Sequence, residues 1–316
     1  MELDEFDLAL IEQLRIDGRA SFESLGAGAG LSRTAARARV QRVLEAGVLR
    51  VVAMVHPEFD GIHAFGHVSI AVQGRTTAQV AASVAQLPDT PFVSIVSGRH
   101  AVVAELRSSD VANLSDTVSL IRSVDGVQSV DTLLYTHLVK EPHTPANGPE
   151  NLDQFDDTDR HLLELLRQDG RMPYADLADR VGLSRGATRT RVLRLIESGV
   201  VAVTGIVNPT AFGMTQMTGF QLHLETDGAA ALSAVGRMDE VDFLARTLGR
   251  CDAVGTLITR TRAETIDILD RMRAIDGVRD LQSWTHLELV KEQYDRRPLR
   301  ALPRSAGASR GAAAAR

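Results

Sequence analysis

Residues 17–44 read DGRASFESLGAGAGLSRTAARARVQRVL, and residues 169–196 read DGRMPYADLADRVGLSRGATRTRVLRLI. The two stretches are copies of one unit, because a shift of 152 positions (159 − 7) aligns residues 7–62 with residues 159–214 without a gap. Of the 56 aligned positions (62 − 7 + 1), 25 are identical. An internal repeat constrains the architecture more strongly than any local pattern does. The chain therefore uses one unit twice.

Each copy has the pattern of a helix-turn-helix. Apolar residues at helical spacing predict a first helix opening at Phe6, a second over Ala20–Ala29 and a third over Arg33–Ala46, with Ser32 as its N-cap. A β-rich run, Val48–Val55, follows as a wing or a connecting strand. The second copy predicts the same elements, namely Asp159–Arg167, Tyr174–Arg180, Arg185–Ser198 after the cap Ser184, and Val200–Val207.

A segment of about 80 residues with a mixed pattern follows each copy. The predicted order is β-α-β-β-α-β in both segments, which is the ferredoxin-like motif. The first segment predicts Ala64–Val72, Thr77–Leu87, Phe92–Val96, Val102–Leu106, Ser109–Val124 and Val127–Val139. The second predicts Met217–Leu224, Ala229–Met238, Val241–Leu248, Ala253–Ile258, Arg262–Ile275 and Val278–Val290.

The predicted fold class is α+β, with two winged-type helix-turn-helix domains alternating with two ferredoxin-like domains. Residues 1–62 and 154–214 form the former, and residues 63–141 and 215–294 form the latter. Residues 142–153 are rich in proline and predict an extended linker. The stretch 295–316 is rich in Arg, Ala, Gly and Ser and predicts a disordered basic tail.

Composition excludes several classes of protein. A single cysteine, Cys251, excludes a disulfide framework and an all-cysteine metal site and suits a reducing cytoplasm. The acidic start lacks a signal peptide, and no apolar run is long enough to span a membrane. The histidines, His67 and His286 among them, are scattered without metal-ligand spacing, and no Ser-His-Asp arrangement is present. We therefore expect no catalytic site, no metal and no cofactor.

The third helix of each copy carries the arginines of the chain's basic face. Net charge is −6, but clustering rather than the total decides nucleic-acid binding. Ala36, Val40, Val43 and Leu44 are expected to face the core, whereas Arg33 and Arg37 project together, one turn apart. The last helix of a helix-turn-helix enters the major groove. The predicted DNA-binding residues are Ser32, Arg33, Thr34, Arg37, Arg39, Arg42, Ser184, Arg185, Thr188, Arg189, Arg191 and Arg194.

A glycine run over residues 26–30 invites comparison with a phosphate-binding loop. That loop needs a preceding strand and a later acidic residue, whereas this run aligns with a helix and its turn in the second copy. Two interior glycines instead weaken a helix by roughly 1 kcal/mol each relative to alanine. The first helix-turn-helix is therefore expected to be the less stable of the two.

Taken together, these motifs resemble the leucine-responsive/asparagine-regulator (Lrp/AsnC) family of transcription factors. The resemblance rests on Asp-Gly-Arg, on Gly-Leu-Ser-Arg before the arginine-rich helix, on Glu-x-Gly-Val after it, on Pro57 and Pro209, and on a glycine between the second and third ferredoxin-like strands. Members of that family usually carry one unit and dimerise through the second domain. This chain is similar to two such units fused, so the resemblance implies a pseudo-dimer within one chain.

The resemblance also implies a small effector, bound by the second domain near a Gly-x-x-Asp turn. The second copy keeps that turn as Gly249-Arg250-Cys251-Asp252, whereas Gly98-Arg99-His100-Ala101 lacks the acid. The carboxylate could accept from the α-ammonium group of an amino acid. The alternative is a purely structural role, in which the glycine makes the turn and the aspartate caps it. The expected effector residues are Gly98, His100, Gly249, Cys251 and Asp252.

We thus expect a cytoplasmic transcriptional regulator that binds double-stranded DNA at an imperfect palindrome and responds to an amino acid or a related metabolite. The unlike half-sites follow from differences between the helices at Thr34/Gly186, Ala36/Thr188, Ala38/Thr190 and Gln41/Leu193. Homo-oligomers of pseudo-dimeric chains are implied by the family, and no membrane partner is expected. Two alternatives remain, a sirohaem decarboxylase on the same fold and an amino-acid-binding module with vestigial heads. The recurring arginines favour the regulator over both.

Overall fold

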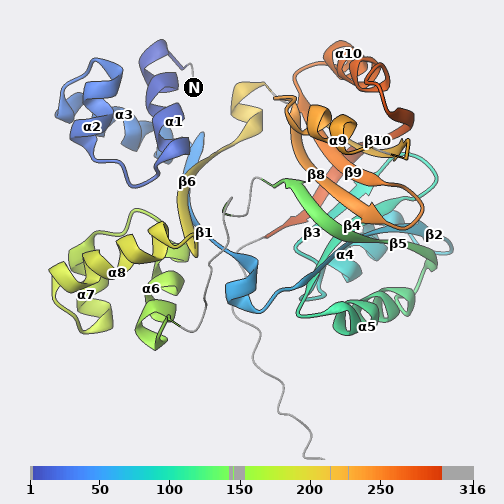
Figure 1. Cartoon of the computed structure of the whole chain (residues 1–316), viewed down its shortest axis with the longest axis horizontal. Helices are drawn as coiled ribbons and strands as arrows, with labels where there is room; N and C mark the ends of the chain where they lie inside the picture. The colour runs from blue at the N-terminus through green and yellow to red at the C-terminus, as the bar shows by residue number, and fades with distance from the viewer. Residues whose placement is uncertain (1–2, 142–144, 146–153, 214, 227, 294–316) are drawn as a thin grey trace, which may run out of the picture.

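The computed structural model describes residues 3–141, 145, 154–213, 215–226 and 228–293 (Figure 1). Apart from Pro145, the predicted linker lies outside the described residues, and so does the predicted tail. The predicted helices and strands are present, and their ends agree with the prediction within two residues. None of the described helices is both long and apolar enough to cross a membrane.

Each helix-turn-helix forms a three-helix head. Head 1 consists of α1 (Glu5–Ile16), α2 (Phe22–Ala29) and α3 (Arg33–Glu45), and head 2 of α6 (Asp157–Gln168), α7 (Tyr174–Val181) and α8 (Arg185–Glu197). The apolar positions predicted for the third helix are confirmed, because Ala36, Val40 and Val43 are buried against the rest of head 1.

Of the two predicted alternatives, a wing or a connecting strand, the structure shows a connecting strand, and it is shared between the heads. Strand β1 (Leu49–Val55) pairs antiparallel with β6 (Val201–Val207), and the two make a separate two-stranded sheet. The strands also exchange core contacts, since Val207 packs against head 1 and Ala53 is buried in the core of head 2. Figure 1 shows this ribbon running between the heads and the rest of the molecule.

Two arginines fasten the heads to each other. The guanidinium of Arg19 donates to the carbonyl oxygens of Gly170 (2.6 Å) and Met172 (2.9 Å). Reciprocally, Arg171 donates to those of Gly18 (2.5 Å) and Ala20 (2.9 Å). Each guanidinium also lies over an aromatic ring of the opposite head, Tyr174 or Phe22. The repeated Asp-Gly-Arg stretch is thus an inter-head contact, which we call the arginine clasp.

The two ferredoxin-like domains close into one barrel. The first contains β2 (Ala64–Val72), α4 (Thr77–Ala85), β3 (Phe92–Val96), β4 (Val102–Ser108), α5 (Val111–Arg122) and β5 (Val127–Lys140). The second contains β7 (Gln216–Leu224), α9 (Ala229–Gly236), β8 (Val241–Leu248), β9 (Ala253–Thr259), α10 (Arg262–Arg273) and β10 (Val278–Glu292). Short 3-10 turns, η1 (Pro57–Asp60) and η2 (Pro209–Phe212), lead from the ribbon into each domain.

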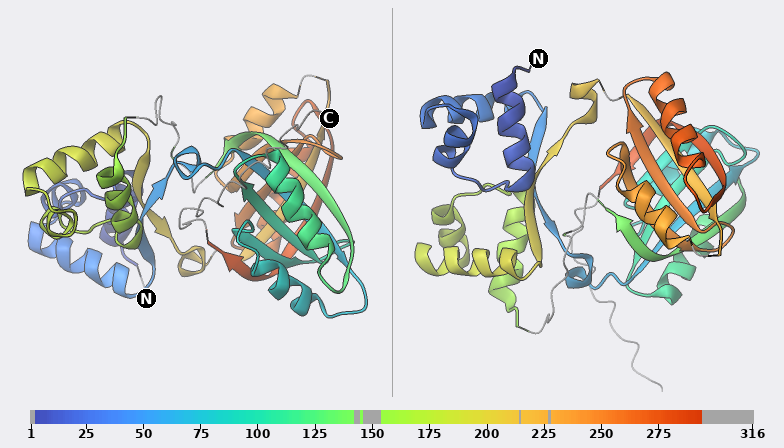
Figure 2. Two further views of the ribbon diagram at one scale, coloured as in Figure 1. Left: turned by 90° about the horizontal axis from the view of Figure 1, so that it is seen from below. Right: turned by 45° about the horizontal axis from the view of Figure 1, so that its top comes forward.

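Strand order around the barrel is β10-β3-β4-β2-β5-β8-β9-β7. The domains join edge to edge at two places, with His286 opposite Val96 and Tyr135 opposite Thr247. These pairs are related by the repeat, because 286 − 135 and 247 − 96 are both 151. The helices cover the outside of the sheets (Figure 2). The expectation that the two domains pack on each other within one chain is confirmed.

Candidate nucleic-acid interface and interior cavity

Helices α3 and α8 begin at equivalent capped turns. The Ser32 hydroxyl accepts a hydrogen bond from the backbone N–H of Ala35, and Ser184 does the same for Ala187, both at 3.2 Å. A serine N-cap satisfies one of the backbone N–H groups that a helix start leaves unpaired. The two predicted serines therefore fix where the helices begin, and both stay exposed there.

Four arginines on the first turns of these helices extend into solvent. Arg33 and Arg37 of α3 are exposed, and so are Arg185 and Arg189 of α8. Among the described residues, no carboxylate forms an ion pair with any of the four. Thr34 is exposed beside Arg33. These side chains form a pair of matched basic surfaces, one on each head.

The other four predicted arginines are held by carboxylates instead. In head 1, Arg39 lies 2.7 Å from Asp4 and 2.9 Å from Asp7, and Arg42 lies 2.6 Å from Asp7. Asp7 is fully buried, and its carboxylate also accepts from the N-cap backbone of α1. The hydrogen bond from Arg39 is the main cause of a lowered pKa at Asp4. Removing an arginine would leave a buried carboxylate short of a partner, which is costly.

Head 2 repeats this cluster. Arg191 lies 2.8 Å from Asp156 and 3.0 Å from the buried Asp159, and Arg194 lies 2.5 Å from Asp159. Arg39 and Arg191 are half-buried and tie the third helix of each head to the first, which the sequence analysis did not predict. Arg42 and Arg194 share that contact but keep an exposed surface.

Thr188 is also misplaced in the predicted set. Its side chain is fully buried, and its hydroxyl donates to the backbone carbonyl of Ser184 at 3.0 Å. The equivalent residue, Ala36, is fully buried as well. This pair faces the core of its head, so the difference between Ala36 and Thr188 cannot distinguish DNA sequences.

The predicted effector turns lie where β3 meets β4 and where β8 meets β9. Gly98 and Gly249 have φ values of 106° and 150°, a region that favours glycine. His100 contacts Asp131 at 3.0 Å, and Arg250 approaches the same carboxylate at 3.9 Å. Burial is the main cause of a lowered pKa at His100. The structure thus brings the two turns near each other at Asp131.

The last two residues of the second turn have structural partners. The Asp252 carboxylate accepts a hydrogen bond from the backbone N–H of Leu224 at 2.7 Å. Cys251 is 3% exposed and packs against Leu133 and Val254. The aspartate therefore ties the turn to the end of β7 and does not cap the turn itself, as the structural alternative had it. Among the described residues, no group of three or more His, Cys, Asp or Glu side chains has the geometry of a metal site.

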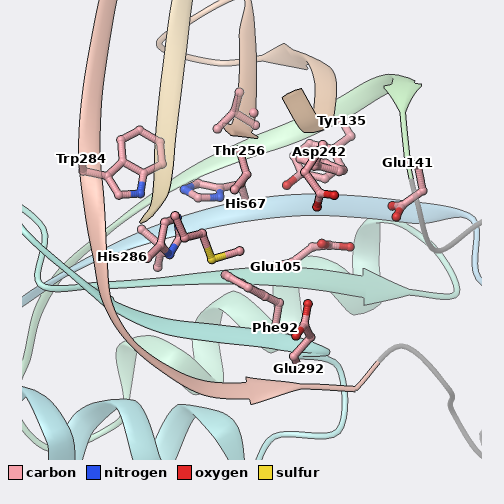
Figure 3. Close-up of a pocket in the computed structure, with 15 residues that line it drawn as sticks. His67, Phe92, Glu105, Tyr135, Glu141, Asp242, Thr256, Trp284, His286 and Glu292 are labelled. Carbon is pink, nitrogen blue, oxygen red and sulfur yellow. The ribbon is translucent and has the colours of Figure 1, made fainter. Parts of the chain in front are cut away.

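A cavity of about 40 Å³ lies inside the barrel, between the two sheets (Figure 3). That volume accommodates roughly three water molecules. None of the five predicted effector residues lines it. The lining residues are His67, Phe92, Val103, Glu105, Tyr135, Glu141, Met217, Asp242, Phe243, Val254, Gly255, Thr256, Trp284, His286 and Glu292.

The cavity wall contains four carboxyl groups and no lysine or arginine. Behind it, the buried Arg107 contacts Glu105 at 2.7 Å and Glu141 at 2.9 Å. Burial, followed by the charge of Glu292, raises the pKa of Asp242 to about 6. Burial likewise raises the pKa of Glu292. Lys140 and Arg15 act in the opposite direction on the pKa of Asp242, and Arg50 does so on that of Glu292.

Rings occupy the other side of the cavity. Burial lowers the pKa of His67 to about 3 and that of His286 to about 4, so both imidazoles are neutral near pH 7. The indole N–H of Trp284 and Nε2 of His286 are buried, and neither has a hydrogen-bond partner within the described part of the chain. Alternation along the strands could have placed these residues inside the barrel, but only once its closure was known.

Comparisons with known proteins agree with the arrangement of domains. The AsnC-type helix-turn-helix domain matches residues 3–43 and 155–196, and the Lrp/AsnC ligand binding domain matches residues 64–145. An uncharacterized HTH-type transcriptional regulator of Pyrococcus abyssi is 28% identical over 142 residues, which are 44% of this chain and 90% of the relative. The HTH-type transcriptional regulator FL11 of Pyrococcus furiosus is 26% identical over 140 residues, again 44% of this chain and 93% of the relative.

A solved structure matches nearly the whole chain. The siroheme decarboxylase NirDL superposes with a TM-score of 0.67, covering 92% of this chain and 93% of the other, at 12% sequence identity. At that identity the similarity establishes a shared fold and no shared chemistry. The sequence relatives, by contrast, match 44% of this chain over nearly their own whole length. The chain belongs to the Lrp/AsnC family of helix-turn-helix transcriptional regulators, with two of the family's units fused in tandem.

Proposed function

We propose that this regulator binds DNA as a single-chain pseudo-dimer, with α3 and α8 entering major-groove segments of one operator. The observation that carries the proposal is the joining of two exposed arginine pairs by the β1–β6 ribbon and the arginine clasp. A helix-turn-helix dimer binds two half-sites at a spacing that its geometry fixes. Here the chain itself supplies both halves, and the ribbon sets their separation.

Within each head, the first two turns of the third helix would contact the bases. Arg33 and Arg37 in head 1, and Arg185 and Arg189 in head 2, have the exposure that this role needs. Arg42 and Arg194 are half-exposed, at 50% and 44%, and could reach phosphates while remaining paired to aspartate. Arginine commonly contacts guanine through two hydrogen bonds, and phosphate contacts add affinity without sequence preference.

The preferred operator would have unlike half-sites. Exposed positions differ between the helices at Thr34/Gly186 and Ala38/Thr190. Gln41 is likewise exposed where head 2 carries the half-buried Leu193. The exposed arginines are the same in both heads. The two half-sites should therefore share the base pairs that these arginines contact and differ at the neighbouring positions. The buried Ala36/Thr188 pair does not contribute to this difference between half-sites.

A mobility-shift titration at defined salt, on fragments from the gene's own upstream region, tests the proposal. Arg185→Ala should weaken binding by about 1–3 kcal/mol if Arg185 contacts a base, and should lower the salt slope by about one if it contacts phosphate. Arg180→Ala, on the exposed surface of α7, is the matched control. Absence of sequence-preferring binding by the wild type, or equal affinity for symmetric sites built from either half, would contradict the proposal.

We also propose that a small effector, an amino acid or a related amine, changes DNA affinity or assembly. Support comes from the match of residues 64–145 to a ligand-binding domain and from the cavity between the two sheets. Further assembly of pseudo-dimeric chains would use exposed apolar side chains on the outer helices, such as Leu120 of α5 and Ile266 of α10. A thermal-shift screen and sedimentation with and without the hit would test both points.

The alternative enzyme would be a sirohaem decarboxylase. The whole-chain superposition and the two histidines in the cavity are the observations in its favour. A cavity of about 40 Å³ is far too small for a tetrapyrrole, so the barrel would have to open substantially. Appearance of a Soret band on haem loading, together with measurable decarboxylation, would reverse the preference for a regulator. A colourless protein that shifts DNA would uphold it.

A further inference from the structure

The lining of the cavity is only partly symmetric about the barrel's pseudo-twofold axis. Four pairs of lining residues are repeat equivalents, each separated by 151 positions, and they are Phe92/Phe243, Val103/Val254, Tyr135/His286 and Glu141/Glu292. Two other lining residues have chemically different equivalents in the other repeat. Glu105 is equivalent to Thr256, and Asp242 is equivalent to Pro91, again at a separation of 151.

Trp284 and His67 mark the largest difference between the halves. Strand β7 has Gly219 where β2 has His67, a separation of 152 residues that the strand registers support (Gly66 pairs with Leu106, and Thr218 with Leu257). A Cβ on Gly219 would lie 2.2 Å from the indole of Trp284. The glycine thus leaves room for the indole ring, whose centroid lies 5.9 Å from that of the His67 imidazole, with the two rings tilted by 43°.

The two sides of the cavity differ in chemistry (Figure 3). Asp242 and Glu141 lie toward one end, next to the aromatic pair Tyr135 and Phe243, whose ring centroids are 5.6 Å apart. At the other end, Trp284 and the two histidines present neutral nitrogen atoms. A carboxylate beside aromatic rings attracts an organic cation. The unpartnered, buried indole N–H of Trp284 favours a ligand with a hydrogen-bond acceptor.

We propose that the interior of the barrel, rather than the β8–β9 turn, is the effector site, and that it takes one amine-bearing small molecule with an acceptor group at its other end. The ammonium group would lie at Asp242, and a carboxylate or carbonyl group would accept from the indole N–H of Trp284. An amino acid is the smallest common molecule with both groups, and the side chains that line the cavity of about 40 Å³ would have to move apart to admit it. The proposal rests on the effector response proposed above, and it names the site and the ligand class.

Stoichiometry follows from the broken symmetry. A site on the axis of a homodimer would offer the same residues to both ends of a ligand. Here Asp242 has no acidic equivalent and Trp284 faces Gly219, so the ligand has a single orientation. We therefore expect one ligand per chain.

Trp284 is the only tryptophan in the chain, so its fluorescence reports on the cavity alone. The test is a titration of the full-length protein with the proteinogenic amino acids and simple alkylamines. Matched carboxylic acids that lack the amine serve as the control ligands. At least one amine should change Trp284 emission saturably, at one equivalent per chain. Asp242→Asn should weaken that ligand's binding at least about ten-fold, whereas Asp239→Asn, on the exposed turn before β8, should leave it unchanged.

Three results would overturn the inference. They are an unchanged affinity in Asp242→Asn, an equal response to the acids without an amine, and the absence of any amine that alters either Trp284 emission or the melting temperature. Loss of binding in Asp252→Asn, with Asp242→Asn unaffected, would place the effector at the β8–β9 turn instead. Ligand-free Asp239→Asn should still shift DNA like the wild type. Failure of the wild type to shift DNA would therefore refute the proposed regulator without touching the cavity result.

Discussion

The two heads have kept the same internal contacts, whereas the two halves of the barrel have diverged around the cavity. In each head, two arginines of the third helix hold one buried aspartate of the first, and the corresponding distances differ by about 0.1 Å. In the barrel, His67 faces the cavity in one half and Gly219 replaces it in the other.

Geometry explains why the divergence is confined to one region. Each head has its own core, and a change in that core must suit a single three-helix unit. The cavity lies where the two halves meet, and in a homodimer every substitution there would occur twice. Fusion removes that constraint. A tandem chain can therefore diverge along its pseudo-twofold axis, inside the barrel, while its two heads stay alike.

The largest expected effect probes the symmetry of the heads. Asp7→Asn and Asp159→Asn each remove a buried carboxylate that caps one helix and pairs with two arginines of another. Each should lower the free energy of unfolding by about 2–4 kcal/mol. Chemical denaturation with head-specific probes would measure both. A difference of more than about 1 kcal/mol between them would show that the heads are not energetically equivalent.

The arginine clasp should matter next. Arg171→Ala removes two hydrogen bonds from a guanidinium to Gly18 and Ala20 and a contact with Phe22, which together are worth about 2 kcal/mol. Because the clasp helps the ribbon to hold the heads at a fixed separation, affinity for a full operator should fall more than affinity for a half-site. Arg15→Ala, which breaks only the exposed pair with Glu12, is the control. Equal losses on full and half operators would remove the clasp from half-site spacing.

Asp242→Asn tests the divergence of the two barrel halves through the pH dependence of the protein's stability. Burial raises the pKa of Asp242 to about 6 in the folded protein, so the folded state disfavours the charged form. Between the unfolded pKa near 3.9 and pH 6, the unfolded chain releases this proton first, and the native state loses stability as pH rises. Above pH 6 the full penalty, roughly 2–3 kcal/mol, is present.

Replacing this carboxyl with a neutral amide should therefore stabilise the ligand-free protein near pH 7.5, and the gain should vanish below about pH 4. Melting temperatures of wild type and variant across that range give the measurement, with Asp239→Asn as the control. A variant that is more stable yet no longer responds to ligand is the behaviour expected of a binding residue. A gain that is independent of pH would contradict the assignment to this carboxyl.

The smallest effect concerns a difference between α3 and α8. Gly186 has open space around its Cβ position and no positive φ, and the equivalent residue of head 1 is Thr34. Gly186→Ala should stabilise head 2 by about 0.5–1 kcal/mol. Gly182→Ala, at a φ of 71°, should instead destabilise it. Stabilisation by both substitutions would mean that helix propensity is not the cause.

Local patterns predicted the elements of the fold, and the repeat predicted their pairing into equivalent domains. Periodicity placed Val40 and Val43 in the core, and capping chemistry placed the start of α3 at Ser32. The ribbon could not be predicted in this way, because a short apolar strand such as β1 has the same pattern whether it pairs within its head or with a strand about 150 residues away.

The functional residues likewise divide into those that local patterns predict and those that depend on contacts between distant segments. Helical spacing showed that Arg33 and Arg37 project together, but spacing cannot show that Arg39 reaches a buried aspartate on another helix. Thr188 was assigned to the DNA surface because it differs between copies, although its burial shows that it fills core space. The cavity depends on closure of two sheets, so its histidines looked scattered along the chain.

The exchange of strands between the heads also has a consequence for synthesis at the ribosome. Leu49 pairs with Val207, 158 residues later (207 − 49), and Val207 is part of the packing of head 1. The first head to emerge thus presents an unpaired strand edge until nearly two thirds of the chain has been translated. Pairings so distant in sequence form slowly, and exposed edges invite aggregation. A chain truncated after its first half would keep that edge and gain a partner only from a second copy, as a dimer.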